Sequence, residues 1–195
     1  MDFKTIIIQV IAVTFAIVVH EFAHGFVAML FGDNSAKNEG RLSLNPFKHL
    51  DPLGVMSLFI FKFGWAKPVP VNSNNLKNYN VGMFFVSIAG IATNFLFAFI
   101  FGKILKYASI NSTFIIDLLV YLMIINLNLA VFNLIPIPPL DGSNILLSFF
   151  SRRTAYEVSK YSRYSSLVLL ILIVSGSVSK IMNLVIWPIF EWILK

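Results

Sequence analysis

Three ionisable side chains stand inside the first long apolar run of this chain, in the stretch IVVHEFAHGFVAMLFGD at residues 17–33. His20 and His24 are four residues apart, so on an α-helix they lie on one face, one turn from each other. Two imidazoles with this spacing can bind one zinc ion, and Glu21 beside the first can take a proton from a water at an open coordination position. The pattern H-E-x-x-H on a helix is typical of zinc peptidases.

A catalytic zinc site usually has three protein ligands and a water. The chain has no cysteine, so the third ligand would be a histidine, an aspartate or a glutamate. His49 lies beside two prolines in NPFKHLDP and is expected to be solvated or interfacial. Asp141 follows the proline-broken stretch NLIPIPP, and such backbone is tolerated at membrane depth where it is buried in protein or lines a cavity. We therefore favour Asp141 over His49.

The composition indicates an integral membrane protein. Hydrophobic residues make up 57% of the 195 residues, charged residues only 12%, and the mean hydropathy is +0.81. A soluble domain carries about 25% charged residues. The net charge of +6 fits basic cytoplasmic loops better than nucleic-acid binding. Without cysteine there is no disulfide framework, and no cleavable signal is expected at the N-terminus.

Four apolar runs predict membrane spans, since a helix needs about 20 residues to cross the hydrocarbon. They cover residues 5–31, 81–103 and 113–135 and a region beginning near Ser165. The fourth run is interrupted by SGSVSK at 175–180, and residues 181–195 could form either an interfacial helix or a return span. We predict an all-α, polytopic transmembrane helix bundle of about four to five spans. It forms a single domain over 1–195, with a catalytic core at about 5–150.

The apolar segment VMSLFIFKFGW at 55–65 is too short to span a membrane. It is rich in β-branched and aromatic residues and is followed by AKPVPVN. We therefore predict a short β-rich or re-entrant segment near 55–71.

The basic residues predict the orientation. Ten of the 15 fall in the two long loops of a four-span chain, at 32–80 and 136–164. Because lysine and arginine collect in cytoplasmic loops, these loops are expected inside and the N-terminus outside. His24 is seven residues from Phe31, and His20 is eleven. At about 1.5 Å per residue, a metal there would lie about 10–16 Å from the cytoplasmic end of the helix. The same topology brings Asp141 to the side of the two histidines.

These motifs together resemble the site-2 protease family of intramembrane zinc metalloproteases. The resemblance covers about residues 10–150, with its motifs in the expected order. Besides HEFAH, they are GRLSLNPFKHLDPLG (40–54), FGWAKPVPVN (63–72), AGIATN (89–94) and NLIPIPPLDG (133–142).

The resemblance implies that His20, His24 and Asp141 are the ligands of one zinc ion per chain. It implies that Glu21 is the general base and later the acid, and that Asn133 helps to hold the substrate or its oxyanion near the metal. The implied activity is hydrolysis of peptide bonds in or near transmembrane helices of membrane-protein substrates. The implied place is the plasma membrane, with the active site open to the cytoplasm.

Gly90 and Asn94 match a family motif that packs close to the catalytic helix. Here the motif reads Ala-Gly-Ile where the family often has Ala-Gly-Pro, which should change local helix geometry rather than chemistry. The chain also resembles small prokaryotic members that have neither a PDZ insertion nor nucleotide-sensing domains.

Several alternatives stay open from the residues alone. His20, Glu21 and His24 could form a buried polar network between helices, or serve a transporter or proton channel. The chain could be a catalytically inactive scaffold, although the intact motif residues argue against this. A zinc peptidase with a glutamate as third ligand is disfavoured, because the glutamates after His24 lie outside apolar helical contexts; they are Glu39, Glu157 and Glu191. The expected partners are the lipid bilayer and membrane-protein substrates, not nucleic acid, and the oligomeric state is open.

Overall fold

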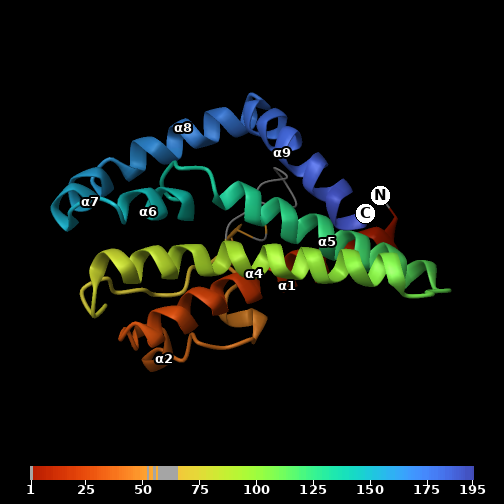
Figure 1. Ribbon diagram of the computed structural model, residues 1–195, viewed down its shortest axis with the longest axis horizontal. Helices are drawn as coiled ribbons and strands as arrows, with labels where there is room; N and C mark the ends of the chain where they lie inside the picture. Colours follow the sequence, from red (N-terminus) through yellow and green to blue (C-terminus); the bar gives the residue numbers. More distant parts are fainter. Residues whose placement is uncertain (1, 52, 55, 57–65) are drawn as a thin grey trace.

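The computed structural model describes residues 2–51, 53, 54, 56 and 66–195 (Figure 1). This part of the chain is all-α, as the sequence predicts, and no strand forms within it. One isolated antiparallel bridge joins Leu50 to Ala66. In chain order the helices are α1 (Phe3–Leu30), α2 (Ser35–Asn38), the 3-10 helix η1 (Pro46–Lys48), α4 (Tyr79–Tyr107), α5 (Thr113–Asn133), α6 (Asp141–Leu147), α7 (Arg152–Ser159), α8 (Ser162–Val174) and α9 (Ser177–Leu194).

Four of these helices, α1, α4, α5 and α9, are long and apolar enough to cross a membrane. The first three match the predicted spans to within a few residues. The predicted fourth span is divided into α8, of 13 residues, and α9, of 18. Gly176 separates them with a left-handed φ of 74°, a conformation that glycine adopts without steric cost. In Figure 1 the two helices form one arch along the bundle, so α9 continues the course of α8 rather than returning beside it.

The β-rich or re-entrant segment predicted near 55–71 falls mostly on residues 55 and 57–65, which lie outside the described residues. The part that is described, from Ala66 to Val71, contains only the bridge to Leu50.

Polar residues fix where several helices begin. A side-chain oxygen in the residue before each of these helices accepts a hydrogen bond from a backbone N–H in the first turn, which would otherwise lack a partner. The pairs are Asp2 with Thr5, Asn78 with Val81, Ser112 with Ile115, and Ser151 with Thr154.

The helices α1, α4 and α5 form the centre of the bundle; α4 runs antiparallel to α1 and α5, which are parallel to each other. At one end, Lys4 at the start of α1 pairs with Asp117 at the start of α5, with 2.7 Å between Nζ and Oδ2. At the other end, the backbone N–H of Lys77, just before α4, donates to the carbonyl of Phe31, just after α1 (2.9 Å). The end of α1 therefore lies beside the start of α4.

Small residues let α1 approach its neighbours closely, as is typical of helix contacts in membranes. Ala12, Ala16 and Ala28 on α1 are completely buried. A second contact joins α9 to α4, where Ile193 occupies the space that a side chain at Gly102 would need. An apolar core lies between α4, α5 and α9; its buried members are Ala98, Met123, Leu127, Val131, Ile186 and Ile193.

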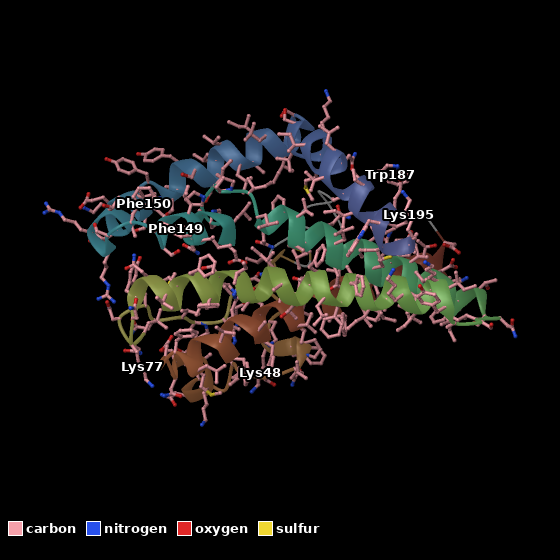
Figure 2. All side chains as sticks on the ribbon, viewed as in Figure 1. Lys48, Lys77, Phe149, Phe150, Trp187 and Lys195 are labelled. Carbon is pink, nitrogen blue, oxygen red and sulfur yellow. The ribbon has the colours of Figure 1, made fainter. Side chains whose placement is uncertain are left out.

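Large apolar side chains are exposed on both halves of the bundle. Figure 2 shows Lys77, Phe149 and Phe150 toward one end of the long axis and Lys195 toward the other. Phe149 at 71% exposure and Trp187 at 63% turn apolar surface outward, which suits a protein whose surroundings are lipid.

Candidate metal centre

His20 and His24 lie on one face of α1, as their spacing predicts, and both are buried. Their Nε2 atoms are 3.0 Å apart, and their rings meet edge to face with centroids 4.5 Å apart. Both histidines therefore direct the same ring nitrogen toward one point inside the bundle.

Asp141 completes this cluster from a distant part of the chain. It is the first residue of α6, directly after the irregular, proline-rich stretch 134–140 that follows α5. Its Oδ2 atom lies 3.1 Å from the Nε2 atoms of both His20 and His24. Among the described residues, these three form the group of histidine and acidic side chains whose ligand atoms all lie within 4.8 Å of one another. His49, the other candidate, does not join it: His49 is fully buried elsewhere, with Nε2 near the carbonyl of Ser43 (2.6 Å).

The outer nitrogens of the two imidazoles have hydrogen-bond partners that fix the rings. His24 Nδ1 lies 2.7 Å from the backbone carbonyl of Val86, and His20 Nδ1 lies 2.6 Å from Oδ1 of Asn94. Because an oxygen acceptor requires N–H at Nδ1, each ring in its neutral form presents a lone pair at Nε2. A metal-ligating histidine usually donates a hydrogen bond of this kind from the ring nitrogen that does not bind the metal.

The cluster fits a divalent cation on chemical grounds. Two nitrogen lone pairs and the Oδ2 of Asp141 converge, and this buried oxygen has no hydrogen-bond donor among the described residues. Three acceptors this close repel one another unless a cation lies between them. Two imidazole nitrogens and one carboxylate oxygen are a ligand set that suits zinc and leaves a position open for water or substrate.

Two glycines make room for the cluster. A Cβ atom at Gly90, on α4, would lie 2.6 Å from Cε1 of His20 and 2.6 Å from Nε2 of His24. A Cβ atom at Gly142 would lie 2.3 Å from the backbone carbonyl oxygen of Leu134. Gly90 thus lets α4 pass directly over the histidines, and Gly142 lets the turn after α5 place Asp141 beside them.

Glu21 is half-buried next to His20, and its Oε2 accepts a hydrogen bond from the backbone N–H of Val69 (2.7 Å). The segment that carries Val69 is itself held in place. The N–H of Lys67 donates to the carbonyl of His49 (2.9 Å), and the guanidinium of Arg41 donates to the carbonyls of Lys67 and Pro68 (2.8 and 3.0 Å). The carboxylate is therefore oriented by a loop far away in the sequence.

Asn133, the remaining predicted site residue, is the last residue of α5, eight positions before Asp141. It is buried, and its amide nitrogen donates to the carbonyl of Leu129 (3.0 Å). No hydrogen bond joins it to His20, His24 or Asp141 within the described part of the chain.

The sequence analysis missed Val69, Val86 and Asn126 as partners of the site. Val69 and Val86 act through backbone atoms and leave no signal in the sequence. Asn126, fully buried on α5, donates to the carbonyl of Leu122 (2.8 Å) and accepts from Asn94 (2.8 Å). An amide within an apolar span was the signal that could have identified it.

A bundle of apolar helices that encloses two histidines and an aspartate defines a membrane protein with a candidate metal centre, and known proteins show which kind. The model of peptidase family M50 matches residues 103–175, which include Asp141 and Asn133. The chain is 37% identical over 190 residues to the "Putative zinc metalloprotease YwhC" of Bacillus subtilis (strain 168), covering 93% of this chain and 85% of the relative. It is 27% identical over 176 residues to the "Putative zinc metalloprotease Rip2" of Mycolicibacterium smegmatis, covering 86% and 67%. No solved structure matches the chain significantly.

The chain belongs to peptidase family M50, the site-2 proteases, and the resemblance noted in its sequence motifs is confirmed. It is a membrane metalloprotease by family, and its relatives are named as zinc enzymes.

Proposed function

We propose that this chain is an intramembrane zinc endopeptidase of the H-E-x-x-H type. It hydrolyses peptide bonds in or near transmembrane helices of membrane-protein substrates, as in regulated intramembrane proteolysis. The observation that carries the proposal is the convergence of His20, His24 and Asp141 at 3.0–3.1 Å inside an apolar bundle. These three residues would hold one zinc ion per chain, with Glu21 beside the first of them.

The mechanism assigns different tasks to Glu21 and Asn133. Zinc at this position would supply a Lewis acid for the scissile carbonyl. Glu21 takes the proton from the attacking water and later delivers it to the leaving amine nitrogen. The N–H of Val69 keeps the Glu21 carboxylate oriented for both transfers. Asn133 has a second N–H besides the one given to Leu129, and it donates this to the substrate carbonyl.

The substrate must change its conformation before it can be cut. A transmembrane helix satisfies its own backbone groups, so its carbonyls are shielded from attack. A substrate helix therefore has to unwind locally where it meets the cluster. The partners of this chain are accordingly the surrounding bilayer and single transmembrane segments that unwind readily.

The active site opens toward the cytoplasm of a multi-pass plasma-membrane protein. The cluster is nearer the end where α1 finishes and α4 begins, since His24 is six residues from Leu30 and Val86 is seven from Tyr79. The loops next to this end carry most of the basic residues, among them Lys37, Lys77, Arg152 and Arg153. Loops of this charge face the cytoplasm.

The test joins metal content to cleavage. Purified wild-type protein should contain one zinc per chain by elemental analysis and cleave a transmembrane reporter in liposomes. A double variant, His24→Ala with Asp141→Ala, should lose both properties. Full zinc occupancy in that variant would show that the ligands are wrong. A wild-type protein that binds no zinc and cuts nothing, but dissipates a proton gradient, would favour the channel alternative.

A further inference from the structure

Behind His20, three hydrogen-bonded side chains on three helices form what we call the amide line: His20 on α1, Asn94 on α4 and Asn126 on α5. His20 Nδ1, on α1, lies 2.6 Å from Oδ1 of Asn94, on α4. The amide nitrogen of Asn94 lies 3.0 Å from the carbonyl of Ala16 and 2.8 Å from Oδ1 of Asn126, on α5. The amide nitrogen of Asn126 lies 2.8 Å from the carbonyl of Leu122. The His20 imidazole is thus connected, through Asn94, to Asn126 on α5.

The direction of every bond in this line is fixed by its ends. A backbone carbonyl can only accept, so the end of Asn126 that faces Leu122 is the NH2 group. The other end of Asn126 is then its oxygen, and Asn94 must donate to it. Asn94 gives its second N–H to Ala16, so its own oxygen faces His20. Nδ1 of His20 is therefore the donor, and Nε2 keeps its lone pair for the metal.

The amide line is buried away from solvent, so reversing the direction of its hydrogen bonds is costly. Asn94 and Asn126 are both completely buried. If the imidazole carried its proton on Nε2 instead, Nδ1 would face the Asn94 oxygen as a second acceptor. Turning the Asn94 amide to suit it would set an oxygen against the oxygens of Ala16 and Asn126. Such a reversal would leave buried polar groups without hydrogen-bond partners, which destabilises the folded protein, so the line holds one tautomer.

The two histidines differ in what holds them. His24 is oriented by a backbone carbonyl, that of Val86, which is present whatever the side chains are. His20 is oriented by a side chain, and that side chain is oriented by a second one. Of the two histidines, only His20 therefore has a tautomer that depends on side chains which a substitution can remove.

We infer that Asn126, acting through Asn94, is a positioning residue that fixes the Nδ1–H tautomer of His20 and thereby strengthens zinc binding. The inference rests on the proposed zinc site. It adds Asn126, on a third helix, which has no hydrogen bond to any of the proposed zinc ligands. An alternative role for the same amides is to hold the helices together. That role predicts an effect on stability alone, whereas the inferred role predicts an effect on zinc affinity and on the ring proton.

The first measurement is zinc affinity, by competition with a chelating indicator in detergent solution. Asn126→Leu keeps the side-chain size and removes the acceptor for Asn94. Loss of the direct outer partner of a metal-ligating histidine weakens binding about 10–100-fold. Because Asn126→Leu leaves Asn94 in place, we expect a decrease at the lower end of that range, about tenfold. Asn128→Leu is the matched control: Asn128 lies on the same helix and makes the same kind of bond, to the carbonyl of Ile124 (2.8 Å), without reaching the site. Its zinc affinity should stay within about twofold of wild type.

The second measurement needs no variant and therefore does not depend on whether Asn126→Leu folds. The chain has three histidines, so nitrogen-15 NMR of histidine-labelled protein can resolve each ring, with zinc and after chelation. We expect His20 to carry its proton on Nδ1 in both states. A wild-type His20 with its proton on Nε2, or unchanged zinc affinity in a folded Asn126→Leu variant, would refute the inference. Wild-type protein that binds no zinc would refute the proposed function instead, while the tautomer would still report on the amide line.

Discussion

The carboxylate of Glu21 accepts a hydrogen bond from the backbone N–H of Val69, with 2.7 Å between Oε2 and the nitrogen. Val69 stands between Pro68 and Pro70, which have no N–H, so it is the donor that this short stretch can offer. Its side chain is buried and packs against Gly25 on α1: a Cβ atom added at Gly25 would lie 3.0 Å from Cγ1 of Val69. Val69 thus meets α1 through one backbone atom and one side chain, and the two contacts can be tested apart.

Replacing Val69 with proline removes the N–H, and replacing it with alanine keeps the N–H but removes most of the side chain. Hydrogen bonds to charged groups contribute about 1.5–3 kcal/mol, so Val69→Pro should lower the cleavage rate about 10–100-fold. Zinc content should not change. Val69→Ala should retain most of the activity. The measurement is the initial rate of reporter cleavage, and equal losses in both variants would show that only packing matters.

Glu21→Gln should bind zinc as the wild type does and lose turnover. Glutamine has nearly the same shape but cannot take a proton from water. General acid–base groups contribute about 10²–10⁴-fold to rates, so the remaining cleavage should be small. Elemental analysis and reporter cleavage on the same preparation check both halves. Cleavage at the wild-type rate would exclude Glu21 as the base.

Gly90→Ala should disrupt the cluster by simple crowding. The added methyl group would lie 2.6 Å from both imidazoles, closer than real Cβ atoms approach other heavy atoms. We expect lost zinc and a lower melting temperature. Gly82→Ala on the same helix is the control, because the atoms nearest to its methyl group would belong to Leu76, at 3.1–3.3 Å, and not to the imidazoles. Normal zinc binding by Gly90→Ala would mean that a methyl group at residue 90 clears both imidazoles. The backbone of α4 would then lie farther from His20 and His24 than the structure shows.

Asp33 should make the loop after α1 sensitive to acid. Burial alone would raise its pKa, but hydrogen bonds from Ser35, Asn75 and the backbone of Asn72 outweigh burial and hold the pKa below the ordinary value of 3.8. A carboxylate with a lowered pKa contributes stability above the ordinary value and loses it as the pH falls through the folded value. The melting temperature of wild type should therefore decrease below about pH 4. Asp33→Asn should melt lower at neutral pH and show a smaller decrease in acid. A wild-type melting temperature that stays level down to pH 2 would contradict this.

The sequence predicts the spans and the metal cluster for different physical reasons. Long apolar runs must cross the membrane as helices, so α1, α4 and α5 follow directly from hydropathy. The spacing of His20 and His24 fixes their common face once α1 is a helix. Asp141 follows from topology, because two spans return the chain to the same side, and the structure brings its Oδ2 to 3.1 Å from both imidazoles.

Other features are not encoded locally. The contact of Glu21 with Val69 depends on how a loop folds back over 48 positions, and a backbone N–H carries no residue type. The line from Asn126 to His20 depends on the rotation of α5 about its axis, which apolar composition on all sides leaves undetermined. The division of the last span at Gly176 could be anticipated from SGS, but the course of α9 is set by its contact with Gly102.

The last prediction concerns orientation: the N-terminus outside, with the loops that carry Asn38 and Ser159 in the cytoplasm. The native chain has no cysteine, so single cysteines can be placed at these two positions and at Asn111, between α4 and α5. All three side chains are exposed, so each should react where reagent reaches it. An impermeant thiol reagent applied to intact cells should label Asn111→Cys alone, and all three should react after the cells are opened. Labelling of Asn38→Cys in intact cells would mean that the cluster of His20, His24 and Asp141 opens outward, and that the ten basic residues of the long loops do not set the topology.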